Sequence, residues 1–298
     1  MLVNPENIAL AFKGFKSIYT DAYSQAPQQM GKVAMTIPSG TRDETYGWLG
    51  QFPQLREWLN GERVVKDLQA HSFTIVNRKF ESTVSVKRED FEDDRLGVFK
   101  PMVQESAHLA RQHPDELVFG LLKDGFTNLC YDGQNFFDLD HPTKDADGNT
   151  VTVANMQDGA ETPWFLLDAS RAVRPMIWQE RQRYDWQTVT ALNDAHVFMT
   201  DEFLFGVRAR VNAGYGLWHM AYASKAPLTA ANYAATRSAM QMLRGDEGRV
   251  LGIKPTIMVV PPSLEETALH VLNTEMNDGG GSNPWKGTAE LVVTPYVA

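Results

Sequence analysis

The most regular pattern of hydrophobic positions in the chain lies between residues 88 and 126. Acidic residues crowd the start of this stretch, and small or apolar residues then recur at intervals of three and four, at Phe99, Met102, Val103, Ser106, Ala107 and Ala110. Acidic side chains suit the positive end of a helix, and this spacing gives a helix one buried stripe. The pattern therefore predicts a long helix over 88–112.

Two prolines interrupt this long helix. Pro101 either kinks it or lies in the first turn of a new helix that begins near Lys100. Pro114 predicts the end of the helix, because the residue before a proline is pushed out of the helical region. Asp115 is then expected to cap a second, shorter helix over 116–123.

Residues 1–32 have the pattern of an arm rather than of a domain. Ile8, Phe12, Phe15 and Tyr19 share helical spacing among Gly, Ser, Gln and Lys residues. A free amphipathic helix of this length is marginal in water, so it needs a partner surface. Two alternatives stay open here. The arm packs on a neighbouring molecule, or it is an ordinary first helix that docks on its own domain.

Short strand-like runs follow the arm. They lie at 33–38, 63–69, 71–77 and 81–87, and residues 164–224 alternate strands with turns. Towards the end of the chain, residues 228–244 predict a helix with Thr229 as its N-cap. The apolar run 257–260 predicts a buried strand.

The end of the chain adds one more helix and one more strand. Ser263 and Glu266 have the spacing of a capping box that opens a helix. A final strand is expected over 289–297. Helices and strands are thus interspersed without a repeating unit, and the sequence predicts an α+β fold.

Composition bounds the class of protein. The chain has 298 residues, with 43% hydrophobic and 22% charged residues, a single cysteine and a net charge of −9. These are globular values, and no apolar run or basic leader predicts a membrane span or a signal peptide. One cysteine suits a reducing cytoplasm, and the acidic balance argues against specific nucleic-acid binding.

The stretch 138–147 has the most chemistry-like composition in the chain. Thr143, Asp145, Asp147 and Gly148 match positions 1, 3, 5 and 6 of an EF-hand loop, but position 12 is Ala154 rather than Glu. Asx residues are also the usual residues of turns, which is the favoured interpretation. The alternative is a metal-dependent hydrolase that uses these acids. No nucleophile, phosphate-loop or zinc motif accompanies them, and no catalytic, cofactor-binding or metal-binding residue is assigned.

Arginines and aromatic residues gather in 164–224. Arg181, Arg183, Arg208 and Arg210 alternate with acidic residues, so salt-bridged subunit contacts are favoured over phosphate binding. Trp48 and Trp58 lie in a glycine-rich segment flanked by strands. They form either a private core or an anchor on a neighbouring subunit.

Several stretches in combination resemble a known family. They are YGWLGQFPQLREWLNGER at 46–63, VKREDFEDDRLGVF at 86–99, CYDGQNFFDLDHP at 130–142 and the segments 248–272 and 287–296. Together they resemble the major head (capsid) subunits of Mu-like bacteriophages and prophages. The resemblance covers nearly the whole chain and implies an HK97-like capsid fold.

The resemblance implies how that fold divides along the chain. Residues 1–32 would form the N-terminal arm and 33–80 the extended E-loop region. A peripheral domain with a long spine helix would comprise 81–126 and 164–224. An axial domain would comprise 127–163 and 225–298.

The resemblance also implies a function. The chain would assemble with itself into pentamers and hexamers of an icosahedral head around double-stranded DNA, which it contacts non-specifically. A separate scaffold protein, a portal and a candidate decoration protein would be its partners, without a membrane, a cofactor or an enzyme activity. It would assemble in the host bacterial cytoplasm and reside in the virion. An encapsulin-like cellular compartment shell, which shares the fold, is the first alternative.

Ten residues are the candidates for subunit contacts. They are Phe12, Phe15, Tyr19, Trp48, Trp58, Arg63, Arg181, Arg183, Arg208 and Arg210.

Overall fold

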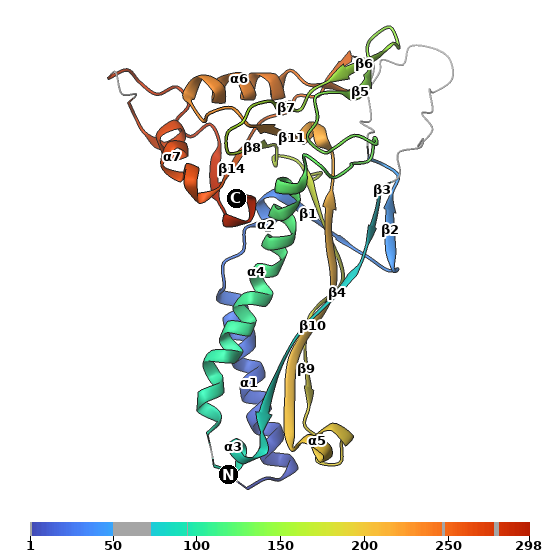
Figure 1. Ribbon diagram of the computed structural model, residues 1–298, viewed down its shortest axis with the longest axis vertical. Coiled ribbons are helices and arrows are strands. Elements are labelled where there is room, and N and C mark those ends of the chain that lie inside the picture. The colour runs from blue at the N-terminus through green and yellow to red at the C-terminus, as the bar shows by residue number, and fades with distance from the viewer. Residues whose placement is uncertain (1, 50–72, 94, 246–247, 277–279) are drawn as a thin grey trace, which may run out of the picture.

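The computed structural model describes residues 2–49, 73–93, 95–245, 248–276 and 280–298. The molecule is elongated, with a long lower part built from two helices beside a sheet and a wider upper part built around a second sheet (Figure 1). The predicted strand at 63–69 lies outside the described residues. None of the helices in these residues is long and apolar enough to cross a membrane.

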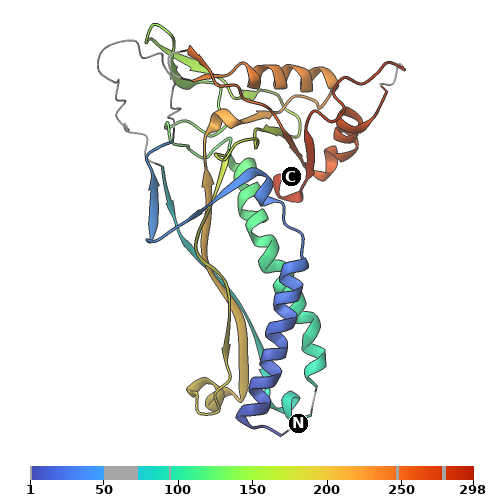
Figure 2. The ribbon, with the colours of Figure 1, turned by 180° about the vertical axis from the view of Figure 1, so that it is seen from behind.

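The lower part pairs two helices with a four-stranded sheet. Helices α1 (Pro5–Gln25) and α4 (Lys100–Asp124) lie side by side (Figures 1 and 2). The strand order is β1-β9-β10-β4, with bounds Ala34–Pro38, Met176–Val189, Glu202–Tyr215 and Arg78–Lys87. Strands β9, β10 and β4 are antiparallel, and β1 runs parallel to β9. The strands predicted at 33–38 and 81–87 are confirmed as β1 and β4.

Helix α1 forms because its sequence supplies a cap, a proline and one apolar stripe. The Asn4 side chain accepts a hydrogen bond from the Asn7 N–H at 2.8 Å, and Pro5 lies in the first turn, where a missing N–H costs nothing. Its stripe is buried in the chain's own interior, as the second of the two sequence alternatives expects.

The predicted helix over 88–112 is wrong in its boundaries. The acidic start forms a short helix, α3 (Arg88–Glu92), and a 3-10 turn, η1 (Leu96–Phe99), precedes α4. Helix α4 begins at Lys100 with Pro101 in its first turn, so the second alternative for that proline is confirmed.

The predicted break at Pro114 is also wrong, because α4 continues through it to Asp124. Pro114 removes one backbone hydrogen bond, but the residue is buried, and the stripe continues through Val118, Phe119 and Leu122, all 0% exposed. The burial of helix residues before and after Pro114 stabilises the helix by more than the proline destabilises it. Asp115 does not cap a second helix. Its carboxylate accepts hydrogen bonds from the N–H groups of Gln29 and Met30 at 2.6–3.0 Å, which start helix α2 (Met30–Val33).

The upper part is built on a five-stranded sheet with two helices. The strand order is β15-β14-β8-β11-β7, with bounds Glu290–Val293, Ile257–Val260, Trp164–Leu167, Ala221–Ser224 and Met156–Gln157. All residues of β14 are buried, which confirms the strand predicted at 257–260. Helix α6 (Ala230–Gln241) is capped, as predicted, by Thr229, whose side chain accepts a hydrogen bond from the Asn232 N–H.

The predicted capping box at Ser263 is wrong. Ser263 lies in a 3-10 turn, η4 (Pro262–Leu264), and helix α7 (Glu265–Asn273) begins after Leu264 without a side-chain cap. Pro261 and Pro262 favour the turn, and Leu264 rather than Ser263 occupies the N-cap position of α7. The final strand, β15, is shorter than predicted. It ends at Val293, and Pro295 starts a 3-10 turn, η5 (Pro295–Val297), because a proline cannot donate a backbone hydrogen bond to the sheet.

Smaller elements complete the described chain. The two-stranded pairs are β2 (Asp43–Tyr46) with β3 (Phe73–Val76), β5 (His141–Lys144) with β6 (Thr150–Val153), and β12 (Arg244–Gly245) with β13 (Arg249–Val250). A 3-10 turn, η2 (Trp218–Met220), precedes β11. Residues 195–200, predicted within a strand, form helix α5 (Ala195–Thr200) at the lower end of the β9–β10 hairpin. Asp194 caps this helix, and Asp201 ends it in the left-handed conformation.

The buried hydrophobic residues of the described chain form two clusters. One lies in the lower part between α1, α4 and the sheet, and the other fills the upper part and its junction with the lower one. Strands β8 and β11 pair in the upper sheet. The segment 164–224, predicted as part of the peripheral domain, therefore begins and ends in the upper part, because its first strand, β8, and its last strand, β11, belong to the upper sheet.

Candidate functional site

The predicted contact residues of the first helix lie inside the chain. Phe12, Phe15 and Tyr19 are each 5% exposed. The Phe12 ring packs edge-on against Phe203 at 6.1 Å, Phe15 lies 5.5 Å from Phe205 and Tyr19 lies 5.1 Å from Trp186. These side chains contact the β9–β10 hairpin of their own chain. A role for them between subunits stays a prediction.

The four arginines lie along the hairpin strands, and acidic residues lie opposite or beside two of them. Arg208 is opposite Asp185 on β9 and Glu81 on β4, and Arg210 is opposite Gln182 and Lys79. Arg183 binds Glu180 at 2.7 Å, although its own side chain is 87% exposed. Acidic neighbours thus lie close to Arg183 and Arg208, and contacts of the four arginines with other subunits stay a prediction.

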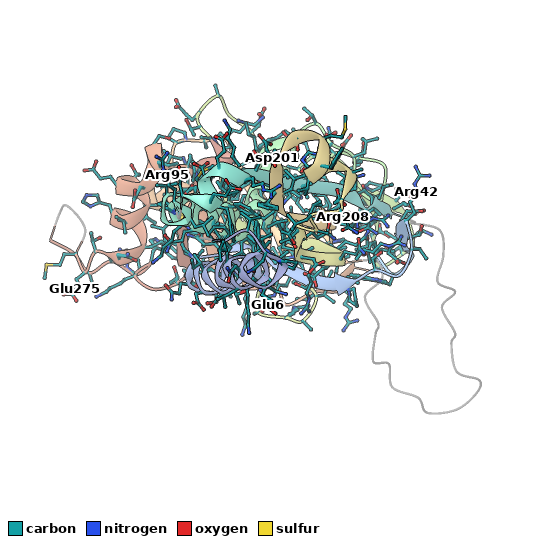
Figure 3. All side chains as sticks on the ribbon, turned by 90° about the horizontal axis from the view of Figure 1, so that it is seen from below. Glu6, Arg42, Arg95, Asp201, Arg208 and Glu275 are labelled. Atoms are coloured by element: carbon teal, nitrogen blue, oxygen red, sulfur yellow. The ribbon has the colours of Figure 1, made fainter. Side chains whose placement is uncertain are left out.

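Two irregularities in the β9–β10 register change how these arginines are presented. The pairing shifts between Arg208 and Arg210 and again between Arg210 and Val211, so that β9 carries extra residues around Arg183 and at Arg181. A bulge re-aims side chains and twists a strand. Figure 3 shows Arg208 and Arg42 on one side of the molecule and Glu275 on the opposite side.

The remaining candidates belong to the segment between β2 and β3. Trp48 is half-buried, packs against the upper core and meets the Tyr46 ring edge-on at 6.3 Å. Trp58 and Arg63 lie outside the described residues. Of the two interpretations of Trp48, the private core accounts for the contacts that the structure gives it.

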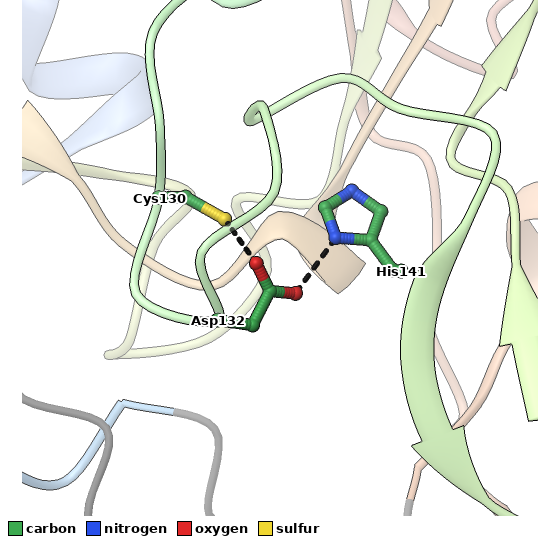
Figure 4. A group of neighbouring side chains, drawn as sticks. All are labelled: Cys130, Asp132 and His141. Carbon is green, nitrogen blue, oxygen red and sulfur yellow. Dashed lines mark hydrogen bonds and ion pairs between the residues drawn. The ribbon is translucent and has the colours of Figure 1, made fainter. Parts of the chain in front are cut away.

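A cluster that the sequence analysis missed joins Cys130, Asp132 and His141 (Figure 4). The Cys130 thiol donates to Asp132 Oδ1 at 3.0 Å, and His141 Nδ1 lies 2.7 Å from Asp132 Oδ2. Burial raises the pKa of the Cys130 thiol, and the charge of Asp132 adds to the rise. Burial opposes ionisation of Asp132 too, but the hydrogen bonds from His141 and Cys130 outweigh it and lower the pKa of the carboxyl.

The second ring nitrogen of His141 also faces an oxygen. Nε2 lies 3.2 Å from Asn155 Oδ1, and the Asn155 amide is oriented by donating to the Phe136 carbonyl at 2.7 Å. Both ring nitrogens therefore lie within hydrogen-bonding distance of a side-chain oxygen, which holds the ring in one orientation. The ring also stacks on Trp218 at 4.0 Å. The network fixes the loop after α4 on the upper sheet.

These three side chains could be considered as metal ligands, since their ligand atoms lie within 4.8 Å of one another. The carboxylate already lies between the thiol and the ring and bonds to both. A thiol with a raised pKa is protonated at neutral pH and is a poor ligand. Hydrogen bonding therefore accounts for the cluster. The sequence missed it because Cys130 and His141 meet only after a turn brings them together.

The acids proposed for a hydrolase are acceptors of turn hydrogen bonds. Asp145 Oδ1 accepts the N–H groups of Asp147 and Asn149 at 2.9 Å each. Asp138 accepts from the Leu139 N–H at 2.7 Å. The favoured interpretation of this stretch, a structural turn, agrees with these bonds.

Comparison with known proteins identifies the family of this chain. The family described as "Mu-like prophage major head subunit gpT" matches residues 8–297. The chain belongs to this family. It is 45% identical over 306 residues to the major capsid protein of Escherichia phage Mu, covering 100% of both chains. It is 42% identical over 306 residues to the Mu-like prophage FluMu major head subunit of Haemophilus influenzae, covering 99% of both.

Solved structures agree. The chain matches the procapsid of bacteriophage JBD30 with a TM-score of 0.88 and 44% identity over 99% of this chain and 100% of that one. For the JBD30 capsid the TM-score is 0.78 at 34% identity over 100% of both chains. For the capsid decorated with minor capsid protein trimers it is 0.77 at 35% identity over 93% of both. The fold is the HK97-like capsid fold, and the chain is a major capsid protein of the Mu-like type, as the resemblance implied.

Proposed function

We propose that the chain assembles with copies of itself into pentamers and hexamers of an icosahedral head that encloses double-stranded DNA. The observation that carries the proposal is the match to the JBD30 procapsid chain over 99% of this sequence, at a TM-score of 0.88. If the same chain occupies both pentamers and hexamers, its contacts must be heterologous and must repeat around each closed ring.

The two parts of the molecule take the two domain roles of the fold. The lower part would be the peripheral domain, with α4 (Lys100–Asp124) as its spine helix. The upper part would be the axial domain, now including β8 and β11. Strands β2 and β3 would form the base of the E-loop region, and α1 the arm.

The chain is proposed to fold in the conformation of an unexpanded shell. Its TM-score is 0.88 with the JBD30 procapsid and 0.78 with the JBD30 capsid, and both alignments cover nearly all of each chain. A shell that changes between two forms needs a subunit with two arrangements of its parts.

Three partners follow from the proposed role. A separate scaffold protein would guide assembly, a portal would occupy one vertex, and a decoration protein would bind outside. The last is supported by the minor capsid protein trimers on the JBD30 capsid. The net charge of −9 suits non-specific contact with packaged DNA, because like charge discourages adhesion. Assembly would take place in the host bacterial cytoplasm and end in the virion.

The arginines of the hairpin are proposed to contact neighbouring subunits. Arg183 reaches solvent although Glu180 binds it, and Arg181 lies at a bulge that turns its side chain from the regular register. Charged residues at a rim steer association and fix register more than they add affinity. No catalytic role is proposed for the chain, since the acids of 138–147 serve the turn.

The test is expression of the chain alone and with a scaffold protein from the same genome, followed by electron microscopy. Shells, tubes or rings of five and six are expected. A chain that stays monomeric at high concentration with its scaffold would overturn the proposal.

A further inference from the structure

The lower end of the molecule carries an exposed apolar pair. Helix α5 closes the β9–β10 hairpin at that end (Figure 1) and turns Val197 inward, at 2% exposed. The next two residues face solvent, with Phe198 81% and Met199 79% exposed. A neighbouring phenylalanine and methionine at the end of a projecting hairpin form a contact surface rather than scattered surface residues.

The same molecule carries an apolar groove of matching character. A cavity of about 190 Å³ opens between α4 and the sheet. We call it the α4–β4 groove, and its apolar lining consists of Phe80, Leu109, Ala110, Tyr184, Val207 and Ala209. Leu109 is 56% exposed at its mouth.

The walls of the groove are fixed while its mouth is open. His113 Nδ1 and the Tyr184 hydroxyl are 2.5 Å apart, and the His113 ring packs edge-on against Phe80 at 4.2 Å. In the part of the chain that the structure describes, β4 pairs only with β10, so its other edge is open beside the groove. A preformed apolar pocket beside a free strand edge is suited to an inserted side chain.

The exposed pair cannot reach the groove of its own chain. Strand β10 starts at Glu202, directly after α5, and its groove residues Val207 and Ala209 lie five to seven residues further along. At the rise of a strand this is roughly 16–24 Å. Any contact between the two surfaces must therefore join two copies.

We propose that Phe198 and Met199 of one copy insert into the α4–β4 groove of a neighbouring copy. The inference rests on the proposed function, which supplies many copies, and goes beyond it by naming the two surfaces. The occupant is a second copy because one chain carries both the apolar protrusion and the apolar groove. Such a pair of unlike surfaces makes a heterologous contact, the type that a repeating shell requires.

Disulfide trapping tests this contact directly. A tagged chain with Phe198→Cys is mixed with an untagged chain with Leu109→Cys and oxidised, and dimers are separated by size. Both positions are exposed, so the fold is preserved, and the native Cys130 is only 6% exposed. The matched control replaces Leu109→Cys by Met242→Cys, which is 71% exposed at the end of α6.

The expected result is about tenfold more mixed dimer for the 198–109 pair than for the control, because docking holds the two thiols at a high effective concentration. Mixed dimer at the control level would overturn the proposal. So would dimers of the Phe198→Cys chain with itself as the main product, since the ends of the hairpins would then meet each other.

Electron microscopy of the same samples separates this inference from the proposed function. Shells or rings together with control-level crosslinking refute the groove contact and leave the capsid role intact. A second variant, Phe198→Ser with Met199→Ser, is expected to lower particle yield about tenfold at an unchanged melting temperature, because the same interface is weakened at every copy in the shell. Unchanged particle yield would count against the groove, and Met242→Ser is its control.

Discussion

Replacing Phe12 decides whether the first helix serves the chain's own core or a neighbour. The ring is 5% exposed and lies 5.5 Å from Phe15, 6.1 Å from Phe203 and 6.2 Å from Phe205. Truncating a buried phenylalanine to alanine costs about 3–5 kcal/mol, and the loss of its aromatic pairs is included in that range.

The unassembled Phe12→Ala chain is therefore expected to lose about 4 kcal/mol of its free energy of unfolding. With a slope of about 3 kcal/mol per molar urea, the midpoint falls by about 1.3 M. The assay is urea unfolding at low chain concentration, followed by far-ultraviolet circular dichroism. Leu10→Ala on the same helix is the control, because Leu10 is 68% exposed and its loss is expected to change stability by less than about 0.5 kcal/mol.

One outcome would refute this reasoning. If Phe12→Ala left the midpoint of the unassembled chain unchanged but abolished particles, Phe12 would belong to a contact between subunits. The alternative of an arm that binds a neighbour would then hold.

Three buried polar groups provide further tests. Asp115→Asn keeps the shape but loses a carboxylate acceptor for the N–H groups at the start of α2, so about 1–2 kcal/mol of stability is expected to be lost in urea unfolding; no change would show that the amide replaces it. Burial lowers the pKa of His219 to about 3, so stability should fall by up to about 1.4 kcal/mol per pH unit below pH 6.5 towards pH 3, and His219→Gln should flatten that slope. The native chain should react with a thiol reagent far more slowly than the urea-unfolded chain, because burial raises the pKa of Cys130; equal rates would contradict the buried network.

The sign for His219 follows from its neutral form. Folding favours the uncharged ring, so the unfolded chain binds the proton more readily at acid pH. Its contribution is therefore complete above the unfolded pKa, near 6.5, and declines as the pH falls towards the folded value. A stability profile without this decline, or an unchanged profile in His219→Gln, would contradict it.

Elements with a strong local pattern could be predicted from the sequence. The apolar run of β14, the Thr229 cap of α6 and the helical spacing of α1 all lie where the sequence placed them. In each case the local preference and the tertiary burial agree. The family and its fold followed instead from the resemblance of the stretches 46–63, 86–99, 130–142, 248–272 and 287–296 to Mu-like head subunits.

Elements that depend on distant partners could not be predicted. Pro114 stays in a helix because burial in the fold outweighs the local rule, and the partner of Asp115 is a helix 85 residues earlier in the chain. Residues 195–200 have the apolar content of a strand, yet Asp194 and Asp201 turn them into a helix at the hairpin end. Periodicity alone cannot identify such short elements.

The candidate contacts of the first helix stay predictions for a related reason. Helical spacing of aromatic residues identifies a buried stripe but not the molecule that buries it, and for Phe12 and Phe15 that molecule is the chain itself. The exposed pair on α5 gave no pattern in the sequence, because two adjacent apolar residues fit a strand or a helix equally well. Only the fold puts Phe198 at the end of a projecting hairpin.

The shape of the lower part explains why the apolar stripe of α1 is buried while Phe198 and Met199 of α5 are exposed. It is one layer of helices on one sheet, and its core cluster takes the apolar side chains of α1 and of the hairpin that face each other across this layer. Side chains buried in that way offer little exposed surface to a neighbour. Side chains that the core leaves exposed are therefore the further candidates for contacts between copies, and Phe198, Met199 and Leu109 are among the most exposed apolar residues of the lower part.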